Sequence, residues 1–394
     1  MNVLTKIYCR TFQGILRLGM AFLKWPKPFV IKGENAFDLL KNNLKERSLH
    51  KPLILLPSFL YKNEKIQKLL SEIDNHYEIK DLINPTIDAV EEMVKIYHEN
   101  NCDCVISIGG GSLIDLGKGT AARVANPKKS LKKMKGIFKV KHKLVPLYAI
   151  PTTAGSGSEA TVAAVISDSN THEKFPINDT KLVPSVAVLE PTLTVSLPKY
   201  LTAITGMDAL THAIECYIGG SNTKQTKKDS IEAVKLILEN LKVAYEDGTN
   251  VKARENMQMA AFLAGAAFTR GYVGYVHALA HQLGGLYNVQ HGEANAILLP
   301  YVLEAYGKKG NKKLKELAID IGRPDLDLIE EIKNMNEFLG IPTYVKQLKK
   351  EDFNIISKRA SKEGNPLYPV PVIFNYKELN NILERVLVKQ WERN

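Results

Sequence analysis

The sequence lacks a long uninterrupted apolar run. Its most apolar N-terminal stretch, from Ile15 to Trp25, contains Arg17 and Lys24, whereas a membrane-spanning helix needs about 20 mostly apolar residues. No small-residue cleavage site follows Phe22, so the stretch does not match a secretory signal either. We therefore expect a protein with no membrane partner.

Cysteine is also scarce. The chain has 4 cysteines in 394 residues and no Cys-x-x-Cys pair, which excludes a disulfide framework. Cys102 and Cys104 flank Asp103 at the start of an apolar run, where small buried thiols are common. A reducing cytoplasm is the compartment that fits this usage.

Acidic residues are fewer than basic ones, 42 against 53, which gives a net charge of +11. Much of the excess lies in two lysine-rich stretches, 128–143 and 308–315. Neither alternates with stacking aromatic residues or belongs to a recognisable nucleic-acid module, and charge patterning alone concerns solubility and non-specific binding. We interpret both stretches as solvated faces and expect no specific nucleic-acid partner.

The first half of the chain alternates short apolar runs with amphipathic stretches. This alternation indicates a parallel sheet covered by helices on both faces, and so an α/β domain over residues 1–197. The expected strands are 53–56, 104–108 and 148–150, and the expected helices are 64–73, 88–100 and 113–125.

After Pro198 the apolar residues recur with the 3.6-residue period of a helix. The pattern predicts an all-α domain over residues 198–394, with the boundary at residues 196–198, where Pro198 interrupts the pattern. The expected helices are 203–218, 230–245, 256–268, 276–286 and 293–306.

Two loops that follow expected strands are rich in glycine and hydroxyl groups. Gly109–Gly111 followed by Ser112 lets the backbone and a helix N-terminus approach a diphosphate closely, although it is not the Gly-x-Gly-x-x-Gly fingerprint. In the second loop, Pro151–Glu159, the hydroxyls of Thr152, Thr153 and Ser156 can donate to phosphate or ribose. Two such loops at the carboxyl ends of strands in one sheet favour a nucleotide site.

Metal-ligand residue types recur at helical spacing in the second half. Asp208 and His212 stand at i and i+4, as do His277 and His281, and His291 follows ten residues later. A single histidine on an apolar helix face is more often a hydrogen-bonded core residue, but an unpaired buried carboxylate would be costly and a cation would satisfy it. Such a set suits Fe²⁺ or Zn²⁺ better than Mg²⁺ or Ca²⁺. Four ligands suffice, and spacing alone does not say which histidine is left for proton work.

Taken together, these motifs resemble the iron-containing (group III) alcohol dehydrogenases over nearly the whole chain, from Lys27–Gly33 onwards. The segments that carry the resemblance are Asn84–Thr86, Gly109–Lys118, Pro151–Glu159, Gly206–Glu215, His277–Gly284 and His291–Gly292.

The resemblance implies that the α/β domain binds NAD(P) and that the helical domain binds the metal. The implied metal ligands are Asp208, His212, His277 and His291, while His281 falls beside the nicotinamide as the catalytic proton relay. The implied cofactor contacts are Asn84, Gly109, Gly110, Gly111, Ser112, Asp115, Thr152, Thr153, Ser156 and Lys174.

One departure from the family pattern concerns the cofactor. Members that prefer NAD carry an acidic residue just after the first strand, which holds the ribose diol, but this sequence reads Leu55–Ser58 there, with no acid until Glu64. Ser58 can donate to a 2′-phosphate, and Lys62 follows four residues later. We therefore expect the site to accept NADP(H). Two further departures, Glu190 for Asp and Gln290 for Pro, leave the expected metal site intact.

The expected reaction is hydride transfer between NAD(P) and a primary alcohol or diol, with the metal as Lewis acid. A dehydroquinate-synthase-like lyase is an alternative, but it would need several basic residues near the ligands, where the sequence has Ala209, Leu210 and Ala278. A non-catalytic basic binding protein is a second alternative. The expected partners are the small alcohol or aldehyde substrate and further copies of the chain, in a dimer or a larger homo-oligomer.

Overall fold

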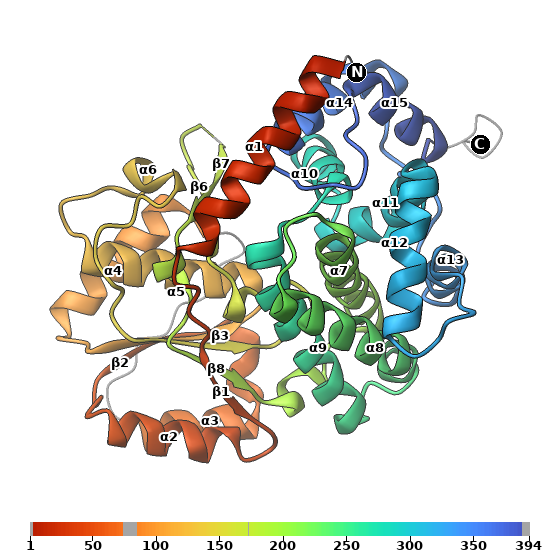
Figure 1. Cartoon of the computed structure of the whole chain (residues 1–394). Coiled ribbons are helices and arrows are strands. Elements are labelled where there is room, and N and C mark those ends of the chain that lie inside the picture. Colours follow the sequence, from red (N-terminus) through yellow and green to blue (C-terminus); the bar gives the residue numbers. More distant parts are fainter. Residues whose placement is uncertain (1–2, 74–84, 172, 388–394) are drawn as a thin grey trace. The chain divides into compact units, whose positions relative to one another are not determined.

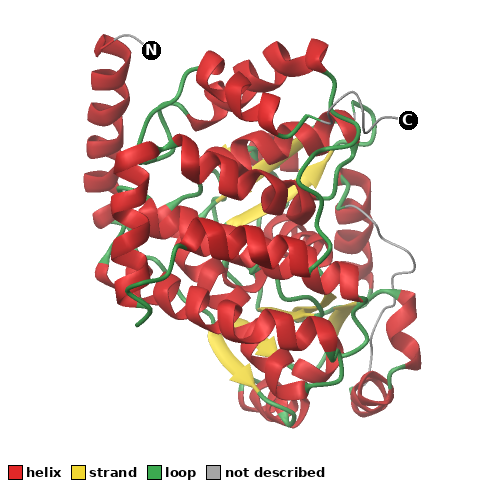
Figure 2. Cartoon of the chain, turned by 90° about the vertical axis from the view of Figure 1, so that its right-hand side faces the viewer, coloured by secondary structure: helices red, strands yellow, loops and turns green. Residues whose placement is uncertain are grey.

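The computed structural model describes residues 3–73, 85–171 and 173–387. Contacts divide the chain into two compact units, one of Lys24–Leu197 and one of Met1–Leu23 together with Pro198–Asn394. We call them the α/β unit and the helical unit. All strands of the described residues lie between Phe29 and Leu189, and the remainder is helix, turn and loop (Figure 2).

The α/β unit is built on a five-stranded parallel sheet with the strand order β1-β8-β5-β3-β2. Each strand is a short run of mainly β-branched or other apolar residues, and β2, β3, β5 and β8 are buried along their whole length. The strands are β1 (Phe29–Lys32), β2 (Pro52–Leu55), β3 (Cys104–Gly109), β5 (Leu147–Pro151) and β8 (Val186–Leu189). The predicted parallel sheet is confirmed.

Helices cover both faces of this sheet (Figure 1). Since side chains alternate along a strand, Leu53 and Val105 point into one core, and Ile54 and Ile106 point into the other. The first core includes residues of α4 (Ile87–Glu99) and α5 (Gly111–Ala125), and the second includes residues of α2 (Ala36–Glu46) and α3 (Glu64–Glu72).

A second sheet of three strands, β4 (Gly136–Ile137), β7 (Lys174–Asn178) and β6 (Ala163–Ser167), was not predicted. Pro176 stands in the middle of β7, and proline argues against a strand in a sequence pattern. The sheet forms nonetheless, because Ile166 and Phe175 pack into the core around α4 and α5. A short helix, α6 (Leu131–Met134), and four 3₁₀ turns complete the unit: η1 (Ser58–Lys62), η2 (Ser158–Ala160), η3 (Thr180–Leu182) and η4 (Pro191–Thr194).

The helical unit consists of helices that bury α7 in their midst. Nearly every residue of α7 from Thr202 to Ile218 is buried, and α8, α9 and α11 pack against it. The helices are α7 (Lys199–Ile218), α8 (Lys224–Glu246), α9 (Val251–Gly271), α10 (Tyr275–Tyr287), α11 (His291–Ala305), α12 (Gly307–Asp320), α13 (Leu328–Phe338), α14 (Phe353–Gly364) and α15 (Tyr376–Arg385), with the turn η5 (Lys350–Asp352). The all-α character predicted for this half is confirmed.

An N-terminal helix, α1 (Val3–Ala21), belongs to the helical unit, whereas the expected α/β domain of residues 1–197 included it. Its inner face buries Cys9, Gln13 and Met20. The Gln13 amide donates to the backbone carbonyls of Pro366 and Tyr368, 3.0 and 2.7 Å away. These contacts join positions more than 350 residues apart, so no local sequence pattern could show them.

Two further expectations concern cysteines and membranes. All four cysteines are buried and free. Among the described residues, no helix combines the length and the apolar run that crossing a bilayer requires.

Candidate active site

Four side chains with metal-ligand chemistry converge in the helical unit. Asp208 and His212 stand one turn apart on α7, His277 comes from α10, and His291 is the first residue of α11. One ligand atom of each lies within 4.8 Å of the others. Asp208 Oδ1 is 3.5 Å from His291 Nε2, 3.9 Å from His277 Nε2 and 4.0 Å from His212 Nδ1. We call these four residues the ligand cluster.

Glycines allow the helices that carry the cluster to approach one another. A Cβ on Gly292 would lie 2.2 Å from the carbonyl oxygen of Ile204, so only glycine lets the start of α11 lie directly on the backbone of α7. A Cβ on Gly274, just before α10, would lie 2.6 Å from Glu215 Oε1. Both close approaches occur beside ligand residues, and they set the spacing of the cluster.

The cluster is suited to a cation in its electrostatics as well as in its geometry. Burial, together with the neighbouring histidines, holds the pKa of His277 well below its ordinary value. The imidazole is therefore neutral at physiological pH, which is the form that binds a metal. Asp208 and His212 are also buried, whereas the side chain of His291 is 42% exposed and lies at the open side of the cluster.

Asn295 stands at the centre of the cluster and was not predicted from the sequence. Its Nδ2 donates to Asp208 Oδ1 at 2.7 Å and lies 3.2 Å from Nε2 of both His277 and His291. The residue is fully buried, and its Oδ1 has no hydrogen-bond partner. The Nδ2 atom of Asn295 is thus close to ligand atoms of three of the four residues, so these atoms point at one position. The only signal in the sequence was the i+4 spacing from His291, which is common for any asparagine on a helix.

Glu215, also missed, orients one of the ligands. It lies on α7 seven residues after Asp208, and its carboxylate accepts hydrogen bonds from the backbone of Gly274 and Val276, each at 2.8 Å. Its Oε2 is 2.7 Å from His277 Nδ1, so the other ring nitrogen of His277 faces the cluster. Burial raises the pKa of Glu215 to about 7 despite these hydrogen bonds. A carboxylate behind a ligating histidine is a common way to fix the tautomer and the ring orientation.

His281 lies beside the ligand cluster but is not one of the four converging residues. Its ring stacks on His291 with centroids 5.3 Å apart, and its side chain is 45% exposed. Its Nδ1 is 2.7 Å from Glu363 Oε1, and the Glu363 carboxylate also accepts from Tyr368 and Gln282. Burial lowers the pKa of His281, but the charge and hydrogen bond of Glu363 outweigh it and hold this pKa above the ordinary value.

The α/β unit brings three of the predicted cofactor segments to one edge of the sheet. Ser58 follows β2, Gly109–Ser112 ends β3, and Thr152–Ser156 follows β5, and these three strands are neighbours and parallel. The backbone N–H of Thr152 donates to the Gly109 carbonyl at 3.0 Å. A Cβ on Gly111 would lie 2.7 Å from Ser156 Oγ, so the glycine loop and the hydroxyl loop are in direct contact.

The other predicted cofactor residues have different surroundings. Asp115 accepts from Ser158 Oγ at 2.7 Å and from the Val165 N–H at 3.0 Å, so it ties α5 to the loop after β5. Lys174 begins β7 with an exposed side chain, and it belongs to the three-stranded sheet rather than to either loop. Asn84 lies outside the described residues.

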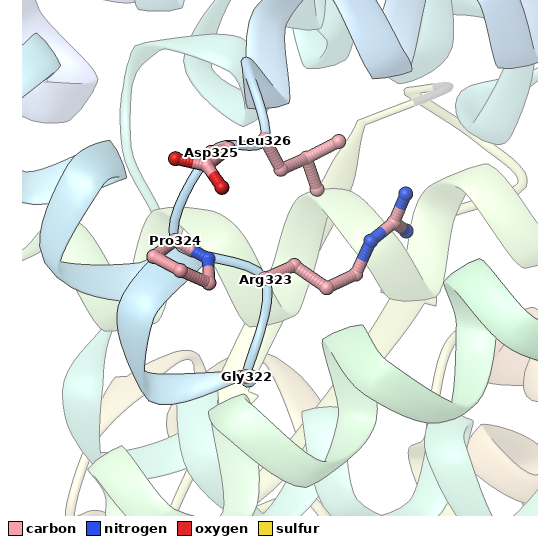
Figure 3. A pocket seen from close by; sticks show the side chains of 5 residues that line it. All are labelled: Gly322, Arg323, Pro324, Asp325 and Leu326. Carbon is pink, nitrogen blue, oxygen red and sulfur yellow. The ribbon is translucent and has the colours of Figure 1, made fainter.

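A surface hollow elsewhere in the helical unit is lined by five consecutive residues, 322–326, in the turn between α12 and α13 (Figure 3). Its lining includes the charged side chains of Arg323 and Asp325 but none of the predicted site residues. We therefore do not assign it to the active site.

Two features of the structure define a class of protein. The parallel sheet has glycine and hydroxyl loops at the carboxyl ends of its strands, which is typical of nucleotide binding. The helical unit brings a buried carboxylate and three imidazoles together, which is typical of a transition-metal site. The two features together indicate a metal-dependent oxidoreductase that uses a nucleotide cofactor. Comparison with known families agrees. The family described as "Iron-containing alcohol dehydrogenase" matches residues 27–191, and "Fe-containing alcohol dehydrogenase family, C-terminal" matches residues 202–387. The chain belongs to the iron-containing alcohol dehydrogenase family and is an oxidoreductase that acts on CH–OH groups.

Individual relatives cover nearly the whole chain. Alcohol dehydrogenase 4 of Saccharomyces cerevisiae is 38% identical over 370 residues, which are 91% of this chain and 96% of the relative. The crystal structure of a 1,3-propanediol oxidoreductase superposes with a TM-score of 0.85 at 32% identity, and covers 93% of this chain and 100% of its own. The sulfoacetaldehyde reductase of Bifidobacterium kashiwanohense, solved in complex with NAD⁺, also gives 0.85, at 28% identity, with coverages of 94% and 100%.

Proposed function

We propose that the protein interconverts a primary alcohol or diol and its aldehyde by hydride transfer with NAD(P), and that Asp208, His212, His277 and His291 hold Fe²⁺. The convergence of these four side chains within 4.8 Å carries the proposal. The names of the relatives support the substrate class, since one is an alcohol dehydrogenase and another a 1,3-propanediol oxidoreductase.

The donor set fits a divalent transition metal. One carboxylate and three imidazoles, with His277 neutral through burial, suit Fe²⁺ or Zn²⁺ better than the oxygen-seeking Mg²⁺ or Ca²⁺. Asn295 supports the fit, because its Nδ2 lies within 3.2 Å of three of the four ligand atoms, so these atoms converge on one position. When bound, Fe²⁺ supplies Lewis acidity toward the substrate oxygen and the nicotinamide supplies the hydride acceptor.

His281 is the residue that we propose to hold and move the proton. Its contact with Glu363 keeps the ring oriented and raises its pKa, so it can deliver a proton to an aldehyde oxygen or accept one from an alcohol. The side chain is 45% exposed, which gives the proton a route to solvent.

The cofactor is proposed to lie along the edge of the sheet where β2, β3 and β5 end. Gly109–Ser112 would contact the diphosphate, and Thr152, Thr153 and Ser156 would donate hydrogen bonds from their hydroxyl groups. That Asn84 and Lys174 also contact the cofactor stays a prediction. Asp115 supports this site indirectly, because its hydrogen bonds with Ser158 and Val165 fix the two loops relative to each other. NADP(H) is the proposed preference, since Ser58 and Lys62 stand at the two ends of η1 with no acidic residue between them.

The test is turnover of a panel of primary alcohols and diols, with both cofactors, by protein reconstituted with Fe²⁺ or with Zn²⁺. We expect alcohol-dependent reduction of NAD(P) that disappears in metal-free protein and returns with Fe²⁺. Unchanged turnover in rigorously metal-free protein would contradict the proposed role of the cluster.

Two other expectations stay open to measurement. The homo-oligomer stays a prediction, which the mass from light scattering tests. The lyase alternative is not favoured, because Leu210 and Ala278, which neighbour the ligands in the chain, are buried and apolar rather than basic.

A further inference from the structure

The last turn of α9 and its connection to α10 contact the ligand cluster and the carboxylate behind it. The ring of Phe268 stacks on the ring of His212, with the centroids 4.1 Å apart. The backbone N–H of Gly274 donates to the carboxylate of Glu215, which orients one of the ligands. Tyr272 lies between these two anchored residues in the chain, so the chain itself places Tyr272 beside the candidate active site.

The backbone of Tyr272 has a conformation that a large side chain rarely adopts. Its φ is 66° and its ψ is 171°, a combination that is found almost only in glycine. Glycine adopts a positive φ without a steric clash because it has no Cβ. Other residues persist in such a conformation only where the surrounding structure holds them there, and they cluster at active sites and ligand contacts. The backbone of Tyr272 therefore points to a function for its side chain.

The hydroxyl group of Tyr272 is available to a ligand. Within residues 3–73, 85–171 and 173–387, this hydroxyl has no hydrogen-bond partner. The residue is half-buried, and burial raises its pKa to about 12. The phenol is therefore protonated at physiological pH and is a neutral hydrogen-bond donor. Polar groups that lose water are normally hydrogen-bonded, so a bound molecule is the expected partner.

The phenol of Tyr272 lies near the residues that hold the proposed proton relay. Burial raises the pKa of Tyr368 well above its ordinary value, and Tyr272 is one of the nearby groups that raise it further. Such an effect requires the two groups to be close together. Tyr368 in turn donates to Glu363 Oε1 at 2.9 Å, and the same oxygen is 2.7 Å from His281 Nδ1.

The surroundings of this phenol favour a second hydroxyl group of the substrate as its partner. The proposed function already assigns the reacting oxygen to the ligand cluster and to His281, so a further donor serves another polar group of the same molecule. The carboxylate of Glu363 disfavours an anionic group at this position. An uncharged hydroxyl oxygen accepts a hydrogen bond from a phenol without this repulsion.

We propose that the Tyr272 hydroxyl donates a hydrogen bond to the second hydroxyl group of a short diol, and so makes the enzyme prefer diols to simple alcohols. This inference rests on the proposed function, because it needs alcohol turnover at this site. A site that hydrogen-bonds a substrate hydroxyl discriminates against the analogue that lacks it. The parent protein should therefore prefer 1,3-propanediol to 1-propanol, which has the same carbon chain without the second hydroxyl.

The test measures kcat/KM for 1,3-propanediol and for 1-propanol with the iron-loaded parent protein and with Tyr272→Phe, which removes only the phenol oxygen. We expect the ratio of the two values, diol over monoalcohol, to fall about tenfold in Tyr272→Phe through the loss of one neutral hydrogen bond. The fall should appear mainly in KM for the diol, while the metal content equals that of the parent. The matched control is Tyr8→Phe, at an exposed tyrosine of α1, which should keep the parental ratio.

Tyr272→Gly, in which a positive φ is unstrained, should lower the ratio at least as much as Tyr272→Phe. An unchanged ratio in Tyr272→Phe would overturn the inference, and a loss confined to Tyr272→Gly would assign the preference to the volume of the ring instead. Equal turnover of both alcohols by the parent protein would also overturn the inference but leave the proposed function intact. No turnover of either alcohol by the parent would contradict the proposed function, and the inference with it.

Discussion

At the scale of single residues, the two imidazoles that stack on each other have different surroundings. His291 points a ring nitrogen at Asp208 and shares the Asn295 donor, while His281 points its Nδ1 at Glu363. A histidine that belongs to a ligand set and one that carries protons are therefore separable by substitution.

We expect His291→Ala to lose the metal and His281→Ala to retain it. Removing one of four ligands weakens metal retention strongly, whereas removing a general acid or base costs about 10²–10⁴ in kcat with the metal still bound. Metal content by mass spectrometry, measured together with kcat, checks both outcomes. A metal-free His281→Ala with a fully loaded His291→Ala would mean that the roles are reversed.

A second prediction at this scale concerns Ser58 and Lys62, which begin and end η1 directly after β2. An acidic residue at this position would accept hydrogen bonds from the ribose diol and repel a 2′-phosphate, and none is present between β2 and Glu64. We expect kcat/KM to be higher with NADP(H) than with NAD(H), and Lys62→Gln to reduce the ratio. A preference for NAD(H) beyond about tenfold, or ~1.4 kcal/mol, would show that other groups hold the ribose.

At the scale of elements, the crossing of α11 over α7 decides whether the cluster can form. We expect Gly292→Ala to destabilise the protein by about 1–3 kcal/mol and to lower its metal content, because the new methyl group would meet the Ile204 carbonyl. The matched control is Gly285→Ala on α10, where nothing lies within 4 Å of the added Cβ; it should be neutral or stabilising by about 0.5–1 kcal/mol. Thermal unfolding and metal content measure both. Equal behaviour of the two variants would show that the helices can separate without loss of the site.

The buried carboxyl group of Glu159, in the turn η2, predicts a pH effect. Burial raises the pKa of Glu159 from its ordinary 4.5 to about 7. The folded state therefore binds this proton more tightly than the unfolded state. The contribution of Glu159 to the free energy of unfolding is fully present below pH 4.5, and it is lost as the pH rises from there through 7. Between pH 5 and pH 8 the parent protein should lose up to about 3 kcal/mol of its free energy of unfolding through Glu159. We expect the variant Glu159→Gln, which has no proton to release here, not to show this loss.

Urea unfolding of the parent protein and of Glu159→Gln at pH 5 and pH 8 measures this difference. The exposed Glu64→Gln, on α3 of the same unit, is the control for removing one carboxylate. If Glu159→Gln and Glu64→Gln changed the pH dependence equally, burial of Glu159 would not be its cause.

Elements with strong periodicity could be predicted from the sequence, and elements that depend on distant contacts could not. The segment 203–218 has a clear helical period, and α7 covers it. The strand β7 was not predicted, because Pro176 interrupts its sequence pattern. That α1 belongs to the helical unit was not predicted either, because its hydrogen-bond partners are the distant carbonyls of Pro366 and Tyr368. The candidate site shows the same division. The helical spacings of the ligand cluster are visible in the sequence, whereas the contact between His281 and Glu363 joins residues 82 positions apart and could not be predicted.

At the scale of the whole molecule, the ligand cluster joins three helices of one unit and none of the other. α7, α10 and α11 each contribute at least one ligand, while the sheet edge with the glycine loop belongs to the α/β unit. A metal bound only by the native cluster stabilises the helical unit by mass action, by about 4 kcal/mol when its concentration is a thousand times the Kd. The α/β unit gains nothing directly from this binding.

We therefore expect removal of the metal to lower the Tm of the helical unit and to leave the unfolding of the α/β unit unchanged. Scanning calorimetry of the full chain, with and without Fe²⁺ under anaerobic conditions, should resolve a transition that moves with metal concentration and one that does not. NADP(H), bound at the sheet edge, should move the second transition. His291→Ala should abolish the response to Fe²⁺, and His281→Ala should keep it, because only His291 belongs to the ligand cluster. A Tm that is independent of Fe²⁺ in the parent protein would contradict metal binding at this cluster, whatever the activity of the preparation.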